Sequence, residues 1–140
     1  MIEVCVKCAG EKLIFTSDVE GPALDDQVEF VLSERPEMVI LDGPMTYMLG
    51  FRYSAKSLQA SVENMVKMLE AGVQTLVVDH HFLRDLNYQE RIGPVYEAAR
   101  DLGARVITAA ELAGKPIEML EARRRELYER YGESGDSIII

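Results

Sequence analysis

The sequence has few of the residues from which metal and redox sites are usually built. It contains two histidines, two cysteines and no tryptophan in 140 residues. Two cysteines cannot hold a chain of this length in a disulfide framework, which excludes a small disulfide-rich fold. A metal site built mainly from imidazoles has only His80 and His81 to draw on, and these two are adjacent.

Basic residues and long apolar runs are also scarce. Lysine and arginine number 15 against 24 acidic residues, which gives a net charge of −9. An acidic chain is a poor match for nucleic acid or an anionic membrane surface. No apolar run approaches the roughly 20 residues that span a bilayer, and no secretory signal opens the chain. We therefore expect a cytoplasmic protein with no nucleic-acid partner and no membrane partner.

The size and composition are those of one soluble domain. The chain is 48% hydrophobic and 28% charged, as is usual for globular proteins. A chain of this length fits a single domain with a real core. We predict one domain over residues 1–140, with residues 132–140 as a frayed tail in which Ile138–Ile140 could add an edge strand.

Short apolar segments predict five strands. Alternation of Ile2, Val4 and Val6 with polar residues is typical of a half-buried strand, and a turn at 9–11 leads to a second strand over Leu13–Thr16. Two continuous apolar runs predict buried strands, and a third, shorter strand comes after them in the chain. These three segments are Met38–Leu41, Thr75–Val78 and Arg105–Thr108.

Helical spacing of apolar residues predicts four helices between and after these strands. They cover Leu24–Arg35, Ser54–Gly72, residues 89–102 and Pro116–Tyr131, and residues 45–53 form a loop. Strands that alternate with helices indicate an α/β fold with a mainly parallel sheet, and an antiparallel hairpin comes first.

Polar residues follow three of the predicted strands. Asp18 follows the second strand, Asp42 the third, and Asp79, His80 and His81 the fourth. In open α/β sheets, ligands bind beyond the carboxyl ends of the strands. Carboxylates with imidazoles suit zinc, manganese or iron, and they equally suit a general base oriented by a carboxylate. An aspartate after a strand is also often only a turn or cap residue.

Three stretches together resemble a known family. Phe15–Asp18, Val39–Pro44 and Leu76–His81 are similar to the second half of a metallo-β-lactamase-fold hydrolase. Residues 16–22, 42–54 and 79–85 resemble more closely an uncharacterised, mainly archaeal family of predicted metal-dependent hydrolases. The resemblance extends to about residue 131. It implies one sheet with its helices, which is half of an αββα sandwich (α+β in some schemes).

The resemblance also implies roles for individual residues. Asp18 would bridge two metal ions and His80 would bind one of them, both at the catalytic centre, with His81 as the alternative metal ligand. The implied cofactor is a divalent metal, zinc before manganese or iron. Ser17 stands where the family usually has glycine.

Four further residues would lie around the ligands. Asp42 and Asp79 would lie at the rim or behind the ligands, where Asp79 could orient an imidazole. Arg52 and Arg84 would contact an anionic substrate.

The family's principal metal motif, His-x-His-x-Asp-His, is absent from this sequence. Asp18 and His80 are too few to coordinate two dications, so we expect the chain alone to bind metal weakly or not at all and to catalyse little. The hydrolase could be split between two polypeptides, the chain could be a fragment, or this half could serve another role.

The uncovered face of a half-sandwich predicts association with an N-terminal half-domain on another polypeptide or with a second copy in a homo-oligomer. A non-enzymatic α/β interaction or assembly module is the alternative function. A complete small hydrolase that uses Asp18, Asp42 and His80 unaided is a third.

Two other motifs point to structure rather than to function. Cys5 and Cys8 form a C-x-x-C on a predicted strand, where their side chains would point to opposite faces, and no second pair exists for zinc. The run Arg123–Arg125 lies among glutamates and is typical of a solvated helix face.

Overall fold

The computed structural model describes residues 2–132. Within them lie five strands: β1 (Val4–Cys8), β2 (Glu11–Phe15), β3 (Met38–Asp42), β4 (Thr75–Asp79) and β5 (Arg105–Ile107). The α-helices of this region are α1 (Asp25–Glu34), α2 (Ala55–Glu70), α3 (Tyr88–Arg91), α4 (Gly93–Leu102), α5 (Ala109–Leu112) and α6 (Arg124–Tyr131). Two 3-10 helices complete it, η1 (Thr46–Met48) and η2 (His80–Arg84).

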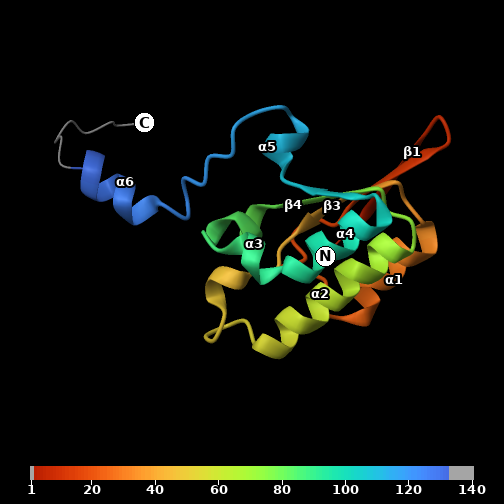
Figure 1. Ribbon diagram of the computed structural model, residues 1–140, viewed down its shortest axis with the longest axis horizontal. Coiled ribbons are helices and arrows are strands. Elements are labelled where there is room, and N and C mark those ends of the chain that lie inside the picture. Colours follow the sequence, from red (N-terminus) through yellow and green to blue (C-terminus); the bar gives the residue numbers. More distant parts are fainter. Residues whose placement is uncertain (1, 133–140) are drawn as a thin grey trace.

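The strands form one mixed sheet in the order β1-β2-β3-β4-β5 (Figure 1). β1 pairs with β2 antiparallel, and the pairs β2–β3, β3–β4 and β4–β5 are parallel. The parallel strands are joined by helical crossovers, as parallel pairing requires. The predicted α/β class and the antiparallel first hairpin are thus confirmed.

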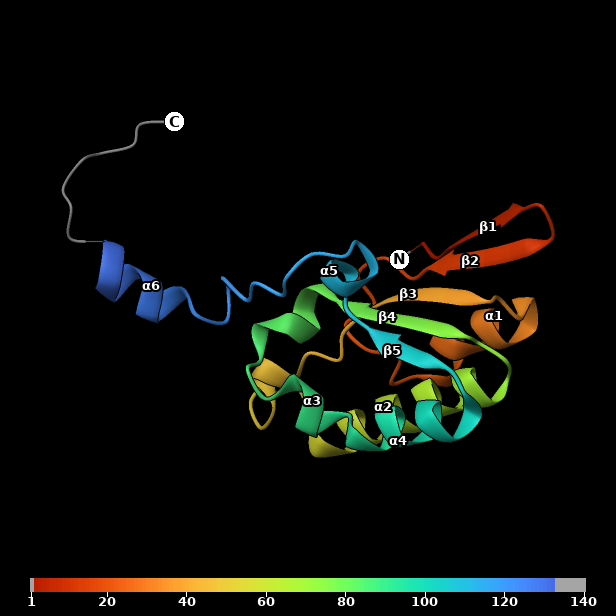
Figure 2. The same cartoon turned by 45° about the horizontal axis from the view of Figure 1, so that its top comes forward.

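Most of the helices cover one face of the sheet, and within residues 2–132 the opposite face is covered only over β4, where Val77 is completely buried. α1, α2 and α4 lie together on the helix-covered face (Figure 2). The side chains that alternate toward them are completely or almost completely buried, and with helix residues such as Val31, Met65 and Val95 they form the core. From the strands these are Ile14, Val39, Leu41, Leu76 and Val78. Period-two alternation assigns one set of strand residues to this core and the other set to the opposite side.

The opposite side, which we call the open face, is built from Val4, Val6, Leu13, Phe15, Met38 and Ile40. These residues are register partners across β1, β2 and β3. Val4, Val6 and Phe15 expose 45%, 52% and 48% of their surface. The alternation predicted for β1 is present, but the expected burial of its valines is wrong. The half-buried residue of β1 that packs on the core is Cys5, whereas Cys8 is exposed.

The predicted helix over 89–102 is two helices, α3 and α4, which meet at Ile92. Pro94 lies in the first turn of α4. A proline has no N–H for the preceding turn and its ring clashes with that turn's carbonyl, so the helix restarts there. The predicted end at Gly103 is confirmed, since Gly103 caps α4 with φ 68°. The helices predicted at 24–35 and 54–72 are also present, as α1 and α2, and Ser54 caps α2 as expected.

The last predicted helix begins later than expected. It starts at Arg124 rather than Pro116. Most side chains of residues 113–132 are exposed, and α6 lies apart from the sheet and its helices in both views (Figures 1 and 2). Without an apolar face packed on the core, little favours a longer helix there. The short α5 was not predicted, although Thr108 and Glu111 form the capping box that begins it.

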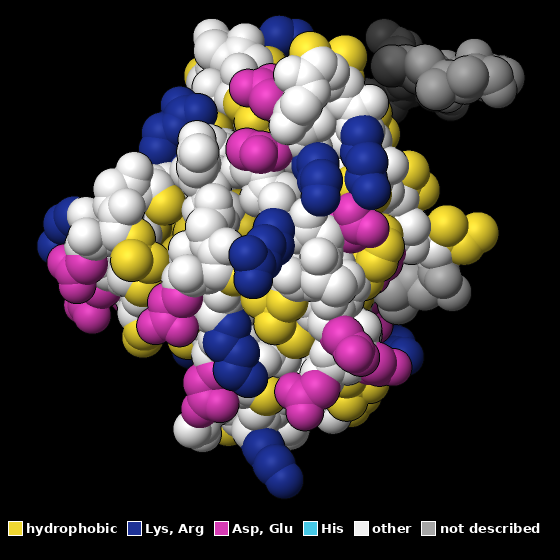
Figure 3. Space-filling view, turned by 90° about the vertical axis from the view of Figure 1, so that its right-hand side faces the viewer, with side chains coloured by type: hydrophobic (Ala, Val, Ile, Leu, Met, Phe, Trp, Pro, Cys, Tyr) yellow, Lys and Arg dark blue, Asp and Glu magenta, His cyan; other side chains and the backbone are white. Residues whose placement is uncertain are grey.

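The side of the molecule seen in Figure 3 carries acidic, basic and hydrophobic side chains interspersed, with no histidine among them. This side therefore shows no continuous basic surface. Among the described residues, no helix has the length and apolar character needed to cross a membrane. The possible edge strand at Ile138–Ile140 lies outside the described residues.

Candidate metal centre

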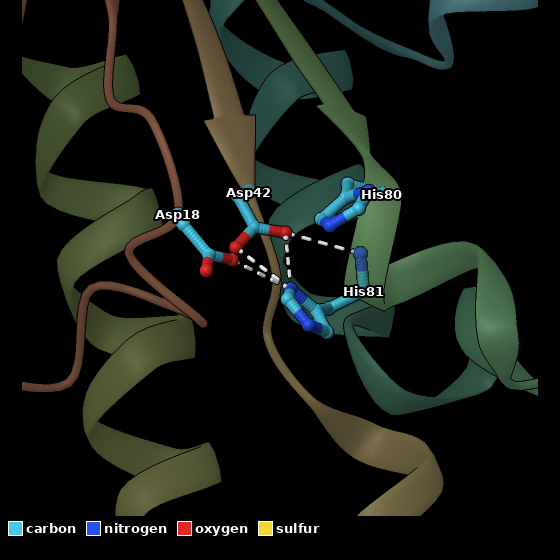
Figure 4. Close-up of side chains that lie close together, drawn as sticks. All are labelled: Asp18, Asp42, His80 and His81. Atoms are coloured by element: carbon cyan, nitrogen blue, oxygen red, sulfur yellow. Dashed lines mark hydrogen bonds and ion pairs between the residues drawn. The ribbon is translucent and has the colours of Figure 1, made fainter.

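The candidate centre lies where three strands end. Asp18 is in the loop after β2, Asp42 is the last residue of β3, and His80 and His81 begin η2 directly after β4. β3 and β4 are in register to their ends, with Asp42 opposite Asp79. The four side chains therefore converge at the carboxyl edge of the sheet (Figure 4), as expected for parallel strands.

His81 is at the centre of the contacts. Its Nδ1 atom lies 3.0 Å from Oδ2 of Asp42, 3.1 Å from Oδ1 of Asp42 and 3.1 Å from Oδ1 of Asp18. Each of Asp18, Asp42, His80 and His81 offers one ligand atom, and these atoms all lie within 4.8 Å of one another. The ligand atoms of Asp18, Asp42 and His80 are thus close enough together to act on one substrate.

Asp42, which we expected at the rim or behind the ligands, lies within this group. It is only 6% exposed. Its carboxylate accepts hydrogen bonds from two backbone N–H groups, that of Glu20 at Oδ2 and that of His81 at Oδ1, each 3.0 Å long. Because Glu20 follows β2 and His81 follows β4, this one buried carboxylate joins all three strand ends. Hydrogen bonds to an ionised acceptor are stronger than neutral ones.

The two loops that carry Asp18 and Asp42 are in close contact. Gly21 donates its backbone N–H to the carbonyl oxygen of Asp42 at 2.9 Å. Gly43 has φ 93°, and a Cβ atom there would collide with the backbone of Glu20 and Gly21. A side chain at position 43 would therefore push the Asp18 loop away from Asp42.

Three non-glycine residues in the segments after β2 and β4 have left-handed backbone conformations. They are Ser17 (φ 57°), Glu20 (φ 56°) and His80 (φ 59°). Such conformations cost energy for residues with a Cβ atom and concentrate at functional sites. The conformation of Ser17 also gives a physical reason why the resembling family usually has glycine at this position.

Asp79 contacts backbone rather than an imidazole ring. Its carboxylate accepts the N–H of His80 at 2.6 Å and the N–H of Ala109 at 2.9 Å. It therefore caps η2 and ties the start of α5 to the end of β4. In this way it fixes the backbone of His80.

Tyr47 and Arg84 lie close to His81. The Tyr47 ring is parallel to the His81 ring, with centroids 6.3 Å apart. The Arg84 guanidinium lies 5.5 Å from the centroid of the Tyr47 ring and donates to its hydroxyl at 3.4 Å. Tyr47 was not predicted, because nothing in the sequence distinguishes it within its loop. Arg52 is exposed and is not a member of the group.

The donor set is of a kind that binds divalent cations. Two carboxylates and two imidazoles are common ligands of such ions. Adjacent ligand atoms around an ion with bonds of about 2.0–2.1 Å are separated by about 2.9 Å in octahedral and about 3.3 Å in tetrahedral geometry. The separations of 3.0 and 3.1 Å between His81 Nδ1 and the two carboxylates fall in this range.

The fold and the group together define an α/β domain with a candidate metal-binding site of two aspartates and two histidines at the carboxyl edge of its sheet. The chain is 55% identical over 131 residues to a UPF0282 protein of Korarchaeum cryptofilum. The matched region covers 94% of this chain and 44% of that relative. UPF0282 proteins of Metallosphaera sedula and Saccharolobus solfataricus are 42% and 41% identical over 128 residues, covering 91% of this chain and 41% and 42% of theirs.

These archaeal relatives support the expected similarity to an uncharacterised archaeal family. The chain spans less than half the length of each of them. No family model matches the chain, and no solved structure gave a significant match.

Proposed function

We propose that residues 1–140 are the C-terminal half of a metal-dependent hydrolase with the metallo-β-lactamase fold. The observation that carries this proposal is the convergence of Asp18, Asp42, His80 and His81 at the carboxyl edge of the sheet. The family resemblance implies metal-ligand roles for residues in this order along the chain. Their proximity allows them to bind the same ion.

Asp18, Asp42, His80 and His81 would hold the ion, with zinc before manganese or iron. A divalent ion held there supplies Lewis acidity for hydrolysis of a carbonyl or phosphoryl bond. Asp42 accepts the backbone N–H of His81, which fixes the residue that carries this imidazole. Asp18, whose side chain is 66% exposed, is the carboxylate best placed to reach a second ion or a substrate. His81 is the better-anchored imidazole, and His80 is the exposed one.

Two observations support the need for a second half. Asp18, Asp42, His80 and His81 each supply one ligand atom, and a dinuclear site needs more than four to neutralise and coordinate two dications. The open face also leaves Val4 and Val6 about half exposed, as expected of a sheet that packs against another layer. The relatives have more than enough additional length to supply that layer.

Zinc titration by calorimetry tests the proposal. We expect weak binding by the chain alone, and at least tenfold tighter binding when it is mixed with an N-terminal half-domain that bears His-x-His-x-Asp-His. Asp18→Asn and His81→Ala should each remove the gain. Asp25→Asn, which removes an exposed carboxylate from the first turn of α1, is the matched control and should preserve it. A mixture that binds no more zinc than its separate parts would contradict the proposal.

The second candidate is a non-enzymatic module that assembles through the open face. The exposure of Val4, Val6 and Phe15 favours it. Sedimentation of the chain with a chelator present tests it. A tight metal-free homodimer, together with no hydrolysis in any mixture, would favour this function over the first.

A further inference from the structure

A pocket of about 270 Å³ lies beside the candidate metal centre, at the carboxyl end of the open face. Asp18, Asp42 and His80 line one part of it, and Phe15 and Ile40 line another. The pocket is therefore bordered both by ligands of the candidate centre and by apolar side chains of the sheet.

Phe15 and Ile40 form a small apolar floor. They are register partners on the adjacent parallel strands β2 and β3. Phe15 is 48% exposed, and it lies only three residues before Asp18. A large aromatic side chain left half exposed this close to a carboxylate–histidine group is explained by an apolar ligand that covers it.

The volume sets the size of that ligand. A dry cavity of about 150 Å³ holds benzene. A pocket of about 270 Å³ therefore accepts one aromatic ring with a few further atoms, and is too small for a large polycyclic group.

The charges around the pocket set its polarity. Asp18, Asp42 and Asp79 contribute to its lining, and no lysine or arginine does so among the described residues. Arg84 is held on Tyr47 and does not line the pocket. A carboxylate or phosphate group on the Phe15 and Ile40 floor would have no cation of this chain to pair with, and burying an unpaired charge is costly.

We propose that this pocket binds an uncharged aromatic group of the substrate, next to the bond that is hydrolysed. The assignment as a substrate pocket rests on the proposed function, whereas the preference for an uncharged ring follows from the pocket alone. The Phe15 ring and the Ile40 side chain pack against the aromatic group. The reacting bond faces Asp18, Asp42 and His80. The rest of the open face, around Val4 and Val6, remains available to the second half.

Methyl and aromatic NMR spectra of the metal-free chain test this with benzyl alcohol as the probe and benzoate as its charged counterpart. We expect benzyl alcohol to shift the Ile40 methyl and Phe15 ring signals in a saturable way, and benzoate to bind at least tenfold more weakly. Ile40→Trp, which fills the pocket, and Phe15→Ala, which removes half of its floor, should each weaken benzyl alcohol binding at least fivefold. Val6→Ala, on the same face but away from the pocket, should leave it unchanged.

Three results would overturn the pocket. One is equal binding of benzoate and benzyl alcohol, another is a set of non-saturable shifts spread to Val4 and Val6, and the third is loss of benzyl alcohol binding when the N-terminal half-domain is added. Because the probe is titrated without metal, this experiment fails separately from the zinc titration. Benzyl alcohol binding without zinc binding would support the pocket and contradict the hydrolase.

Discussion

The two faces of the sheet differ sharply, although the same strands build both. On the helix-covered face, Ile14, Val39 and Leu76 are completely buried. On the open face, Val6 and Phe15 keep about half of their surface exposed. Burial of apolar area stabilises a protein roughly in proportion to the area removed from water. The covered face therefore holds most of the stability of this chain, and the open face holds its capacity to associate.

The largest expected effect separates the two faces by one matched substitution. Val39→Ala removes two buried methyl groups and leaves a cavity, so we expect it to lower the free energy of unfolding by about 2 kcal/mol. Val6→Ala removes the same atoms from the open face, and should cost less than about 0.5 kcal/mol. Urea unfolding followed by circular dichroism measures both. Equal losses would show that the open face is buried in solution.

A smaller effect is expected on association. Val6→Lys places a charge on the open face, so it should weaken binding of the N-terminal half-domain about tenfold, or about 1.4 kcal/mol. Leu102→Lys is the control, since Leu102 is equally exposed, at 51%, but lies at the end of α4. Titration calorimetry with each variant measures the affinity. If both variants bind alike, the open face is not the interface.

The smallest expected effect concerns an ion pair between the edge strand β1 and helix α1. Glu34 of α1 lies 2.8 Å from Lys7 of β1, and hydrogen bonding to Lys7 lowers the pKa of Glu34 below its usual value. A lowered pKa in the folded state stabilises the fold above the pKa of the unfolded chain, and this contribution is lost as pH falls through the lowered value.

Glu34→Gln should therefore lower Tm slightly at pH 7 and leave it unchanged at a pH below the lowered pKa of Glu34. Thermal unfolding at both pH values measures the difference, with Glu29→Gln on the same helix as the control. The effect should be small because exposed ion pairs contribute little. An equal loss of Tm at both pH values would mean that the Glu34 charge is not the cause.

Much of the fold could be predicted from the sequence because its signals are local. The apolar runs of β3 and β4 and the spacing of α2 each identify an element without reference to the rest of the chain. The errors fall where tertiary packing or a single residue decides. Pro94 divides the helix predicted at 89–102. Most side chains of the segment after α5 are exposed, so little packing supports a helix before Arg124.

The candidate site was predictable in part for the same reason. Asp18, His80 and His81 stand at strand ends, and strand ends can be read from the sequence. The central position of Asp42 could not be read, because it depends on backbone N–H groups that reach it from Glu20 and His81 in two other loops. The contacts of Tyr47 with His81 and Arg84 depend in the same way on the approach of η1 to η2.

The sequence by itself determined the α/β class, the alternation of strands and helices with a mainly parallel sheet, and the presence of two aspartates and two histidines near strand ends. These follow from periodicity and from the rule that parallel strands share a carboxyl edge. Only the tertiary structure decided that His81 Nδ1 lies between Asp18 and Asp42, and that Val4 and Val6 remain exposed. The alternation of side chains along a strand divides them between two faces of the sheet. Which face is covered depends on where the helices pack.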